Sequence, residues 1–323
     1  MSRVVAGLIF VSCVIPASAQ TTHPTHSLFA NVLDRNGNAV RDLTKDSFRV
    51  EVNRRPAVVL EATYSAAPRR IAVLLDISGS MAGDQEKKWR IAHEALDDLL
   101  AEVPAGVPIA LLTFSDHVHD MFDFSQSRES VAAWIKEGPS QTNIRAHGRT
   151  AIYDAVAAAS KMFGTARPGD AIYVITDGGD NCSHVSETAA RKIVSESGIR
   201  FFVFLLSEPS PMEAERDGKD GVIDIARTTG GFVFGVSSRS SATSFLPSWN
   251  SSYDYDDHTR EKIRLYTEAL YILVNGFYTL QLDSSVTAAK VRRVSLDVLD
   301  EAGNPRKDVA FMYSSALRAQ PGH

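Results

Sequence analysis

The sequence predicts an α/β protein with a doubly wound, mostly parallel sheet and a smaller, split β domain. Two uninterrupted apolar runs, 71–76 and 171–176, are typical of strands that are covered on both faces. Apolar residues between such runs recur at helical spacing, as over 152–163. This alternation of strands and helices favours a parallel sheet with helices packed against it. Further strand-like runs occur near both ends of the chain, which indicates a separate β unit.

The composition is that of an ordinary globular protein. The chain has 323 residues, enough for one large domain and a smaller one. Hydrophobic residues make up 44% of the chain and charged residues 23%, so a sizeable core can form. The formal net charge of -5 gives no electrostatic basis for binding nucleic acid.

Residues 1–19 are predicted to be a signal peptide. Arg3 provides a positive start, 4–15 form an apolar segment, and Ala-Ser-Ala at 17–19 is a small-residue cleavage site. We therefore expect a secreted or periplasmic protein with no stable membrane span after cleavage. The alternatives are lipid attachment at Cys13 and an N-terminal membrane anchor. The anchor is less favoured, because the apolar run is shorter than the ~20 residues that a membrane span needs. Cys182 would be the single cysteine of the mature chain, either as a buried thiol or as a partner for another chain.

The segment 20–68 is predicted to be β structure. Alternating apolar residues predict strands at 27–33, 48–52 and 58–64. The Asn-Gly pair at 36–37 predicts a turn after the first of them. This unit is too short to fold well alone.

The large domain is predicted to span 69–237, from the apolar run that ends at Asp76 to a last short strand. Its expected strands are 71–76, 109–114, 117–124 (an edge strand with charged residues), 171–176, 199–206 and 232–236. Its expected helices are 89–103, 131–135, 152–163, 186–198 (capped by Ser186 and ended by Gly198) and 222–226, with a charged loop at 209–221.

A serine-rich connector is expected at 238–256, followed by a helix and β segment at 257–323. The helix is expected at 258–274 and the strands at 277–282, 291–299 and 309–313. We expect these strands to pair with those of 20–68, because neither set has enough strands for a core of its own.

A cluster of oxygen-bearing side chains follows the first central strand. Asp76, Ser78 and Ser80 lie where this strand ends, and Gly79 permits a tight turn there. In such sheets ligands bind beyond the carboxyl ends of the strands. One carboxylate and two hydroxyls are hard donors that suit Mg²⁺, which keeps several waters and leaves room for an outside ligand.

Two later stretches complete this cluster. Thr150 stands at the start of a predicted helix, and Asp177 follows the strand 171–176. Together the Asp-x-Ser-x-Ser, Thr and Asp elements resemble the metal-ion-dependent adhesion site of the von Willebrand factor type A domain, as found in bacterial secreted proteins. The resemblance implies a Rossmann-like fold over 70–237.

The resemblance also implies roles for individual residues. Ser78, Ser80 and Thr150 would contact Mg²⁺ or Mn²⁺ through their hydroxyls, and Asp76 and Asp177 directly or through water. A carboxylate from a protein partner would complete the coordination shell, so the implied function is metal-dependent protein binding or adhesion.

Arg149 departs from the family pattern, which often has Gly before the Thr, and it adds a positive charge near the site. Asp180 is a further acid near the site that we expect to be solvated.

Other functions remain open at the level of sequence. The metal could be purely structural, with the working surface elsewhere. A metal-dependent hydrolase is the less favoured alternative, because Ser78 has no Gly-x-Ser-x-Gly setting and no histidine placed to activate it; we therefore expect no enzyme. His117 and His119 would share one face of a strand, but the sequence shows no evident third ligand for a transition metal, so a solvated edge is expected.

Overall fold

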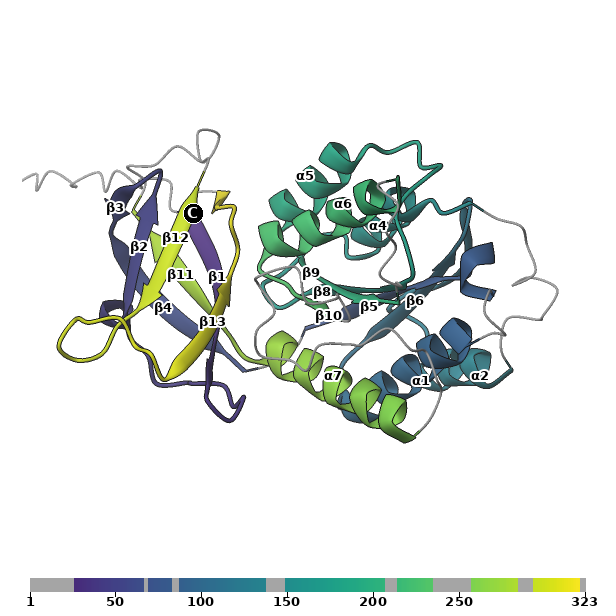
Figure 1. The fold of residues 1–323 in the computed structure, drawn as a ribbon, viewed down its shortest axis with the longest axis horizontal. Helices are drawn as coiled ribbons and strands as arrows, with labels where there is room; N and C mark the ends of the chain where they lie inside the picture. The colour runs from purple at the N-terminus through teal and green to yellow at the C-terminus, as the bar shows by residue number, and fades with distance from the viewer. Residues whose placement is uncertain are drawn as a thin grey trace, which may run out of the picture.

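The computed structural model describes residues 26–66, 69–82, 87–137, 149–206, 214–234, 257–283 and 293–319. The predicted signal peptide and the predicted connector, 238–256, lie outside these residues. The described chain forms an α/β unit beside a β unit (Figure 1). The predicted fold class is confirmed.

A six-stranded sheet forms the centre of the α/β unit, in the order β10-β9-β8-β5-β6-β7. Its strands are β5 (Ile71–Asp76), β6 (Ile109–Phe114), β7 (Val118–Phe122), β8 (Ala171–Thr176), β9 (Arg200–Leu205) and β10 (Val233–Phe234). All neighbours pair in parallel except β7, which lies antiparallel to β6 at the edge. Every residue of β5, β6, β8 and β9 is buried, which explains their continuous apolar sequence.

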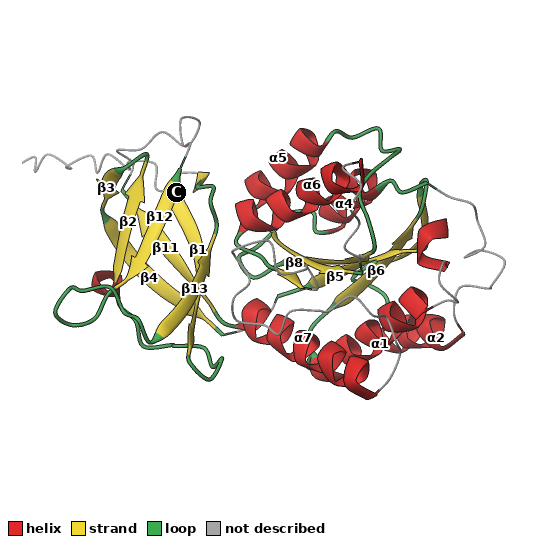
Figure 2. Cartoon of the chain, viewed as in Figure 1, coloured by secondary structure: helices red, strands yellow, loops and turns green. Residues whose placement is uncertain are grey.

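Helices cover both faces of this sheet (Figure 2). One face carries α1 (Lys87–Glu102), α2 (Arg128–Glu137) and α7 (Asp257–Asn275). The other carries α4 (Ile152–Met162), α5 (Glu187–Ser197) and α6 (Ala214–Thr229). The predicted cap of α5 is present, since the Ser186 hydroxyl accepts a hydrogen bond from the Ala189 backbone N–H at 3.2 Å. Gly198 ends this helix with a φ of 74°. None of the described helices has the length and apolar character that a membrane span needs.

The prediction of a charged loop over 209–221 is wrong for its second half, because α6 begins at Ala214. The sequence of this part has a glycine at 221, which lowers helix propensity. The structure shows why the glycine is compatible with the helix: a Cβ at Gly221 would lie 2.0 Å from the hydroxyl of Tyr153. The missing side chain therefore lets α6 approach α4 closely.

The β unit is built from both ends of the described chain. Its strands are β1 (His26–Asp34), β2 (Phe48–Val52), β3 (Arg55–Ala57), β4 (Val59–Ser65), β11 (Phe277–Leu282), β12 (Val294–Val298), β13 (Val309–Tyr313) and β14 (Arg318–Ala319), with a short 3-10 helix, η1 (Lys45–Ser47). One sheet has the order β13-β1-β11-β4 with β14 beside β1, and the other has the order β12-β2-β3. The strands from the two ends are interleaved, as expected. The short strands β3 and β14 were not predicted. A shared apolar core includes Leu28, Val50 and Leu296.

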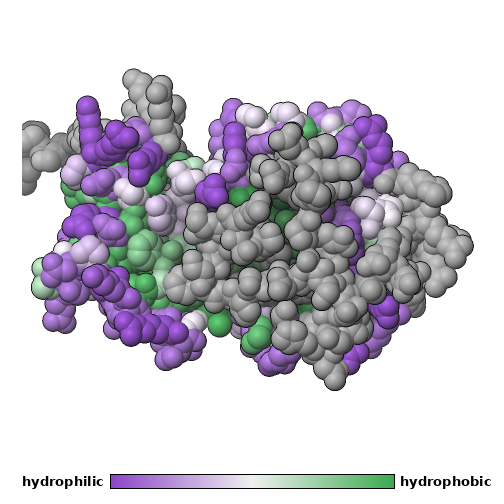
Figure 3. All heavy atoms as spheres, viewed as in Figure 1, coloured by the Kyte–Doolittle hydropathy of each residue, from purple (hydrophilic) through white to green (hydrophobic). Residues whose placement is uncertain are grey.

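The surface of the β unit is mixed in polarity. Figure 3 shows hydrophobic atoms gathered between hydrophilic ones on the near face of this unit. Two of its apolar side chains are exposed, Val58 to 60% and Leu60 to 47%, at and beside the edge strand β4.

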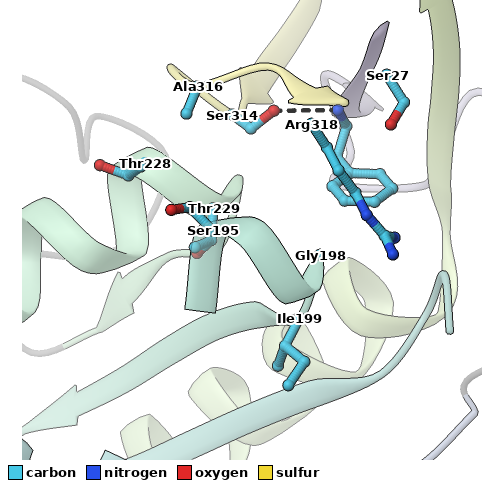
Figure 4. A pocket seen from close by; sticks show the side chains of 10 residues that line it. Ser27, Ser195, Gly198, Ile199, Thr228, Thr229, Ser314, Ala316 and Arg318 are labelled. Carbon is cyan, nitrogen blue, oxygen red and sulfur yellow. Dashed lines mark hydrogen bonds between the residues drawn. The ribbon is translucent and has the colours of Figure 1, made fainter. Parts of the chain in front are cut away.

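Buried polar contacts join the two units. The Asn31 amide donates to the backbone carbonyls of Leu273, at 2.9 Å, and Gly276, at 2.5 Å, at the end of α7. The Arg200 guanidinium of β9 donates to the Asn31 side-chain oxygen. At a narrow cavity beside this junction, the Ser314 hydroxyl accepts from the Phe29 backbone N–H at 3.1 Å (Figure 4).

Candidate metal centre

The predicted metal cluster lies at one edge of the central sheet, where parallel strands have their carboxyl ends. Asp76 is the last residue of β5 and Asp177 directly follows β8. These two strands are neighbours in the sheet. After Asp76 the chain turns through Ser78 into the 3-10 helix η2 (Gly79–Ala82) and then into α1. Strand pairing therefore brings together two acids that are about a hundred residues apart in sequence.

The side chain of Asp76 is fully buried and fixed on both oxygens. Its Oδ1 accepts from the Ser78 backbone N–H at 2.8 Å. Its Oδ2 accepts from the hydroxyl of Thr176 at 2.6 Å. These contacts hold the carboxylate in one orientation and fold the following loop over it.

The hydroxyls and Asp177 form a continuous chain of oxygens. Ser78 Oγ lies 3.1 Å from Ser80 Oγ, and Ser80 donates to Asp177 Oδ1 at 2.9 Å. Octahedral Mg²⁺ binds oxygens at 2.0–2.1 Å, which places adjacent ligands about 2.9 Å apart. The observed oxygen separations therefore fit adjacent ligands of such an ion. The residues also fit in type, since all are hard oxygen donors.

The electrostatics of the cluster favour a cation. Burial, together with the nearby charge of Asp177, raises the pKa of Asp76 to about 6. The Lys88 ammonium lies 2.7 Å from Asp177 Oδ2 and supplies one positive charge. A divalent ion would stabilise the ionised form of both acids.

Thr150 lies on the neighbouring loop and is 5% exposed. Its backbone N–H donates to the Asn181 side chain at 2.8 Å, and its carbonyl accepts from the Asn181 N–H at 2.9 Å. Asn181 comes four residues after Asp177, so this pairing places Thr150 beside the β8 end of the cluster. The hydroxyl of Thr150 as a metal ligand stays a prediction.

Arg149 and Asp180, near the cluster, have structural partners. The Arg149 guanidinium donates to the Asn181 carbonyl. The Asp180 carboxylate accepts from the Ser183 hydroxyl, which in turn accepts from two backbone N–H groups at the start of α4, both at 3.1 Å. Asp180 therefore helps to cap α4, whereas the sequence suggested a solvated acid.

Cys182 is partly buried near the same edge. Its Sγ lies 3.9 Å from the Asp116 carbonyl, and burial raises the pKa of its thiol.

Sequence reasoning missed Lys88, Thr176 and Asn181, which all contact the predicted ligands. Thr176 was visible in the sequence as the polar end of an apolar strand. Lys88 and Asn181 carry no local pattern that marks them. His117 and His119 are exposed, as the sequence predicted, and Asp116 lies beside both as a potential third ligand that the sequence did not make evident.

Comparison with known proteins identifies the family of the central part of the chain. Residues 71–179 match the family model of the von Willebrand factor type A domain, and this span contains all five predicted ligands. No curated protein matches the chain in sequence.

Several solved structures are similar to this chain. An aerotolerance-related membrane protein from Bacteroides fragilis is 20% identical, with a TM-score of 0.45, and the match covers 64% of this chain and 98% of that one. Proximal thread matrix protein 1 from the mussel byssus is 19% identical, with a TM-score of 0.47 and coverage of 67% and 48%. A von Willebrand factor type A protein from Catenulispora acidiphila is 13% identical, with a TM-score of 0.44 and coverage of 91% and 75%.

Domains that match this family model generally mediate protein–protein interactions, and they often bind a divalent metal. The matched residues contain the strands β5, β6 and β8 and the loops that carry the oxygen cluster. The chain therefore contains a domain of the von Willebrand factor type A family.

Proposed function

We propose that this protein binds a protein partner through a divalent metal ion, Mg²⁺ or Mn²⁺, held by Asp76, Ser78, Ser80, Thr150 and Asp177. The observation that carries this proposal is the chain of oxygens from Ser78 through Ser80 to Asp177, with separations of 3.1 Å and 2.9 Å. Those separations match adjacent positions around an octahedral ion.

The charge of the cluster leaves a place for a ligand from outside. Asp76 and Asp177 offset the two charges of the ion, and the five proposed protein ligands do not fill the octahedral coordination of Mg²⁺. Ser80 is exposed, whereas Asp76 and Ser78 are buried, so the open side of the cluster faces solvent at Ser80. A carboxylate from a partner is a hard, charged oxygen donor that suits this position.

The contacts of the two serines support binding over catalysis. Ser78 bonds with Ser80, and Ser80 donates to a carboxylate. A serine nucleophile needs a base that accepts its proton during attack, most often a histidine. Asp177 is the acceptor of Ser80 here, and its other carboxylate oxygen already pairs with Lys88. We therefore propose a binding protein and no enzyme.

We further propose that the protein acts outside the cytoplasm. The support is the sequence of residues 1–19, with a basic start, an apolar segment and Ala-Ser-Ala before the cleavage point. Removal of that segment leaves one cysteine, so export would not require an internal disulfide.

The first experiment tests the metal site by thermal melts of the mature protein in EDTA, Mg²⁺ and Mn²⁺. Metal at about a hundredfold excess over its dissociation constant should raise the midpoint by roughly 5–10 °C. Asp76→Ala and the milder Ser80→Ala should both lose this rise. Ser125→Ala, which removes an exposed hydroxyl away from the site, should keep it. If the native midpoint does not respond to metal, or responds equally in Ser80→Ala, the site is wrongly assigned.

A second experiment separates partner binding from structural use of the metal. Immobilised protein is exposed to arrays of peptides with Asp or Glu and to matched peptides with Asn or Gln, in Mg²⁺ or in EDTA. Metal bridging predicts capture of acidic peptides only with Mg²⁺ and only in protein with Ser80 intact. Metal-dependent stability without such capture would assign the ion a structural role.

A further inference from the structure

A second group of metal-ligating side chains lies on the turn between β6 and β7. It consists of Asp116, His117 and His119, and it shares no residue with the oxygen cluster around Asp76. One potential ligand atom from each residue lies within 4.8 Å of those of the other two. No other group of three or more His, Cys, Asp or Glu meets this criterion within the described part of the chain.

The local backbone explains why these three side chains converge. The turn is closed by a hydrogen bond from the Ser115 N–H to the His117 carbonyl at 3.0 Å. Val118, between the two histidines, starts β7 and is partly buried, so the side chains on either side of it project to the opposite, outer face. The imidazole rings consequently lie side by side, with centroids 4.0 Å apart.

The distances suit a tetrahedral ion after small side-chain rotations. Asp116 Oδ1 lies 2.6 Å from His117 Nδ1 and 3.8 Å from His119 Nε2. In a tetrahedral zinc site with bonds of 2.0–2.2 Å, neighbouring ligand atoms lie about 3.3–3.5 Å apart. The two observed separations fall on either side of that value. Rotation of exposed side chains would equalise them, since Asp116 and His117 are 53% and 66% exposed.

The more buried ring is already oriented. Ser115 is fully buried, and its hydroxyl lies 2.6 Å from His119 Nε2 and 3.1 Å from Asp116 Oδ1. This contact orients the ring beside the carboxylate, and a metal ion bound at Nε2 would take the place of the Ser115 hydroxyl there.

The ligand types select a different ion from that expected at Asp76. Two imidazole nitrogens and one carboxylate suit Zn²⁺ and related transition metals, whereas Mg²⁺ prefers oxygen ligands alone. Three protein ligands leave a fourth position for water or an incoming ligand. The Cys182 sulfur, a soft donor on an adjacent loop, lies 3.9 Å from the Asp116 carbonyl.

We propose that Asp116, His117 and His119 form a binding site for a divalent transition-metal ion of the zinc class, with a fourth position open to solvent. The site lies at the same edge of the sheet as the oxygen cluster, because the Ser115 carbonyl accepts from the N–H of Ala151, the residue after Thr150, at 2.6 Å. This proposal does not depend on the proposed function of the Asp76 cluster.

The test is a titration of the mature protein with Zn²⁺ in competition with a chromophoric indicator, in millimolar Mg²⁺ so that hard oxygen sites are occupied. We expect one saturable equivalent of Zn²⁺. His117→Ala and His119→Ala should each weaken binding about tenfold or more, since each removes one of three ligands. His184→Ala is the matched control, because His184 is also an exposed histidine paired with a single carboxylate, that of Asp154 at 3.1 Å. It should bind Zn²⁺ like the native protein, as should Ser80→Ala.

A measurement on the unaltered protein guards against variants that fail to fold. In long-range ¹H–¹⁵N spectra, the signals of two histidine rings should change with one equivalent of Zn²⁺. One of these two signals should be missing from His117→Ala and the other from His119→Ala. The proposal is overturned if Zn²⁺ does not saturate the native protein. It is also overturned if Zn²⁺ binds the two folded histidine variants as tightly as it binds the native chain.

Discussion

Arg200 is a buried charge that is held by neutral oxygens. The side chain is 1% exposed, and its guanidinium donates to the backbone carbonyls of Gly230 and Leu273 and to the side-chain oxygen of Asn31. It also lies over the rings of two phenylalanines, with centroids 4.9 Å and 4.8 Å away. Burial lowers the pKa of Arg200 to about 9, so the group is still charged at neutral pH. Its role is to join three separate backbone segments, since β9, α7 and β1 all meet at this residue.

Arg200→Met should therefore destabilise the fold although methionine is apolar and of similar length. The change leaves buried acceptors without a donor, and the expected loss is about 2–4 kcal/mol in the free energy of unfolding from urea titrations. Arg49→Met is the matched control, because Arg49 pairs with Asp297 at the surface, with side chains 46% and 48% exposed. Its loss should stay below about 1 kcal/mol. Equal losses for the two variants would contradict the role given to Arg200.

Lys88 should compete with a metal ion for Asp177. Its ammonium lies 2.7 Å from one oxygen of this carboxylate, while Ser80 donates to the other. Lys88→Met removes one positive charge beside the cluster, worth about 1 kcal/mol at a partly exposed site, so Mg²⁺ should bind roughly 3- to 10-fold more tightly by calorimetry. Arg90→Met, two residues further along the same helix at an exposed position, serves as the comparison. Weaker binding in Lys88→Met would show instead that the lysine holds Asp177 in place.

At the residue scale, the sequence predicted those site residues that are marked by their type and by their position at the end of a strand. Asp76 and Asp177 end buried apolar runs, and parallel pairing brings such ends together. Lys88, Asn31 and Arg200 could not be assigned in this way, because their partners are distant in sequence and no local periodicity marks them. The structure supplies the geometry of the oxygen cluster, while the role of its members as ligands remains a prediction.

At the scale of elements, Gly231 is needed for the close packing of the last loop against β9. A Cβ at this position would lie 1.8 Å from the Phe201 carbonyl oxygen, which is backbone and cannot move aside cheaply. The adjoining residue Phe232 accepts a hydrogen bond from the Val203 N–H at 2.9 Å, so the approach is fixed by strand pairing. The structure therefore gives a steric reason for glycine at this position.

Gly231→Ala should accordingly destabilise the protein by about 1–3 kcal/mol, as expected for forced overpacking. Gly106→Ala provides the same chemical change with nothing within 4 Å of the added atom. That variant should be neutral or slightly stabilising, because alanine restricts the unfolded chain. Denaturation midpoints of the two variants make the comparison directly, and a Gly231→Ala midpoint equal to that of Gly106→Ala would contradict it.

Elements with a continuous or periodic apolar pattern were predicted closely, and elements without one were not. The strands β5, β6 and β8 have the bounds that the apolar runs indicate. Helix α6 was predicted too short because its first turns have a polar sequence that contains glycine. In the structure, Val222 and Ile225 are buried in the second half of this helix, and the helix extends from that packed half toward its N-terminus. Strand β3 has three residues, including a proline, and is defined by its pairing with β2.

At the scale of the whole molecule, the β unit makes the two ends of the chain interdependent. Strand β1 pairs with β11 and β13, and β2 pairs with β12, so each sheet needs strands from both sides of the α/β unit. The last helix, α7, runs into β11 and is held there by Asn31 of β1. A force or displacement at the end of α7 therefore acts directly on the β unit, and the two units should unfold together.

This coupling predicts a single calorimetric unfolding transition for the native mature protein, with equal calorimetric and van't Hoff enthalpies. Asn31→Leu removes the amide that donates to Leu273 and Gly276 and the oxygen that accepts from Arg200, so the transition should broaden or separate into two. Asn36→Leu, in an exposed turn of the same segment, should leave a single transition near the native midpoint. Because Asn31 lies in the β unit and its partners lie in or beside the α/β unit, two resolved transitions in the variant would measure the stability of each unit alone. Two transitions in the native protein would show that the strands from the chain ends form a core that folds without support from the central sheet.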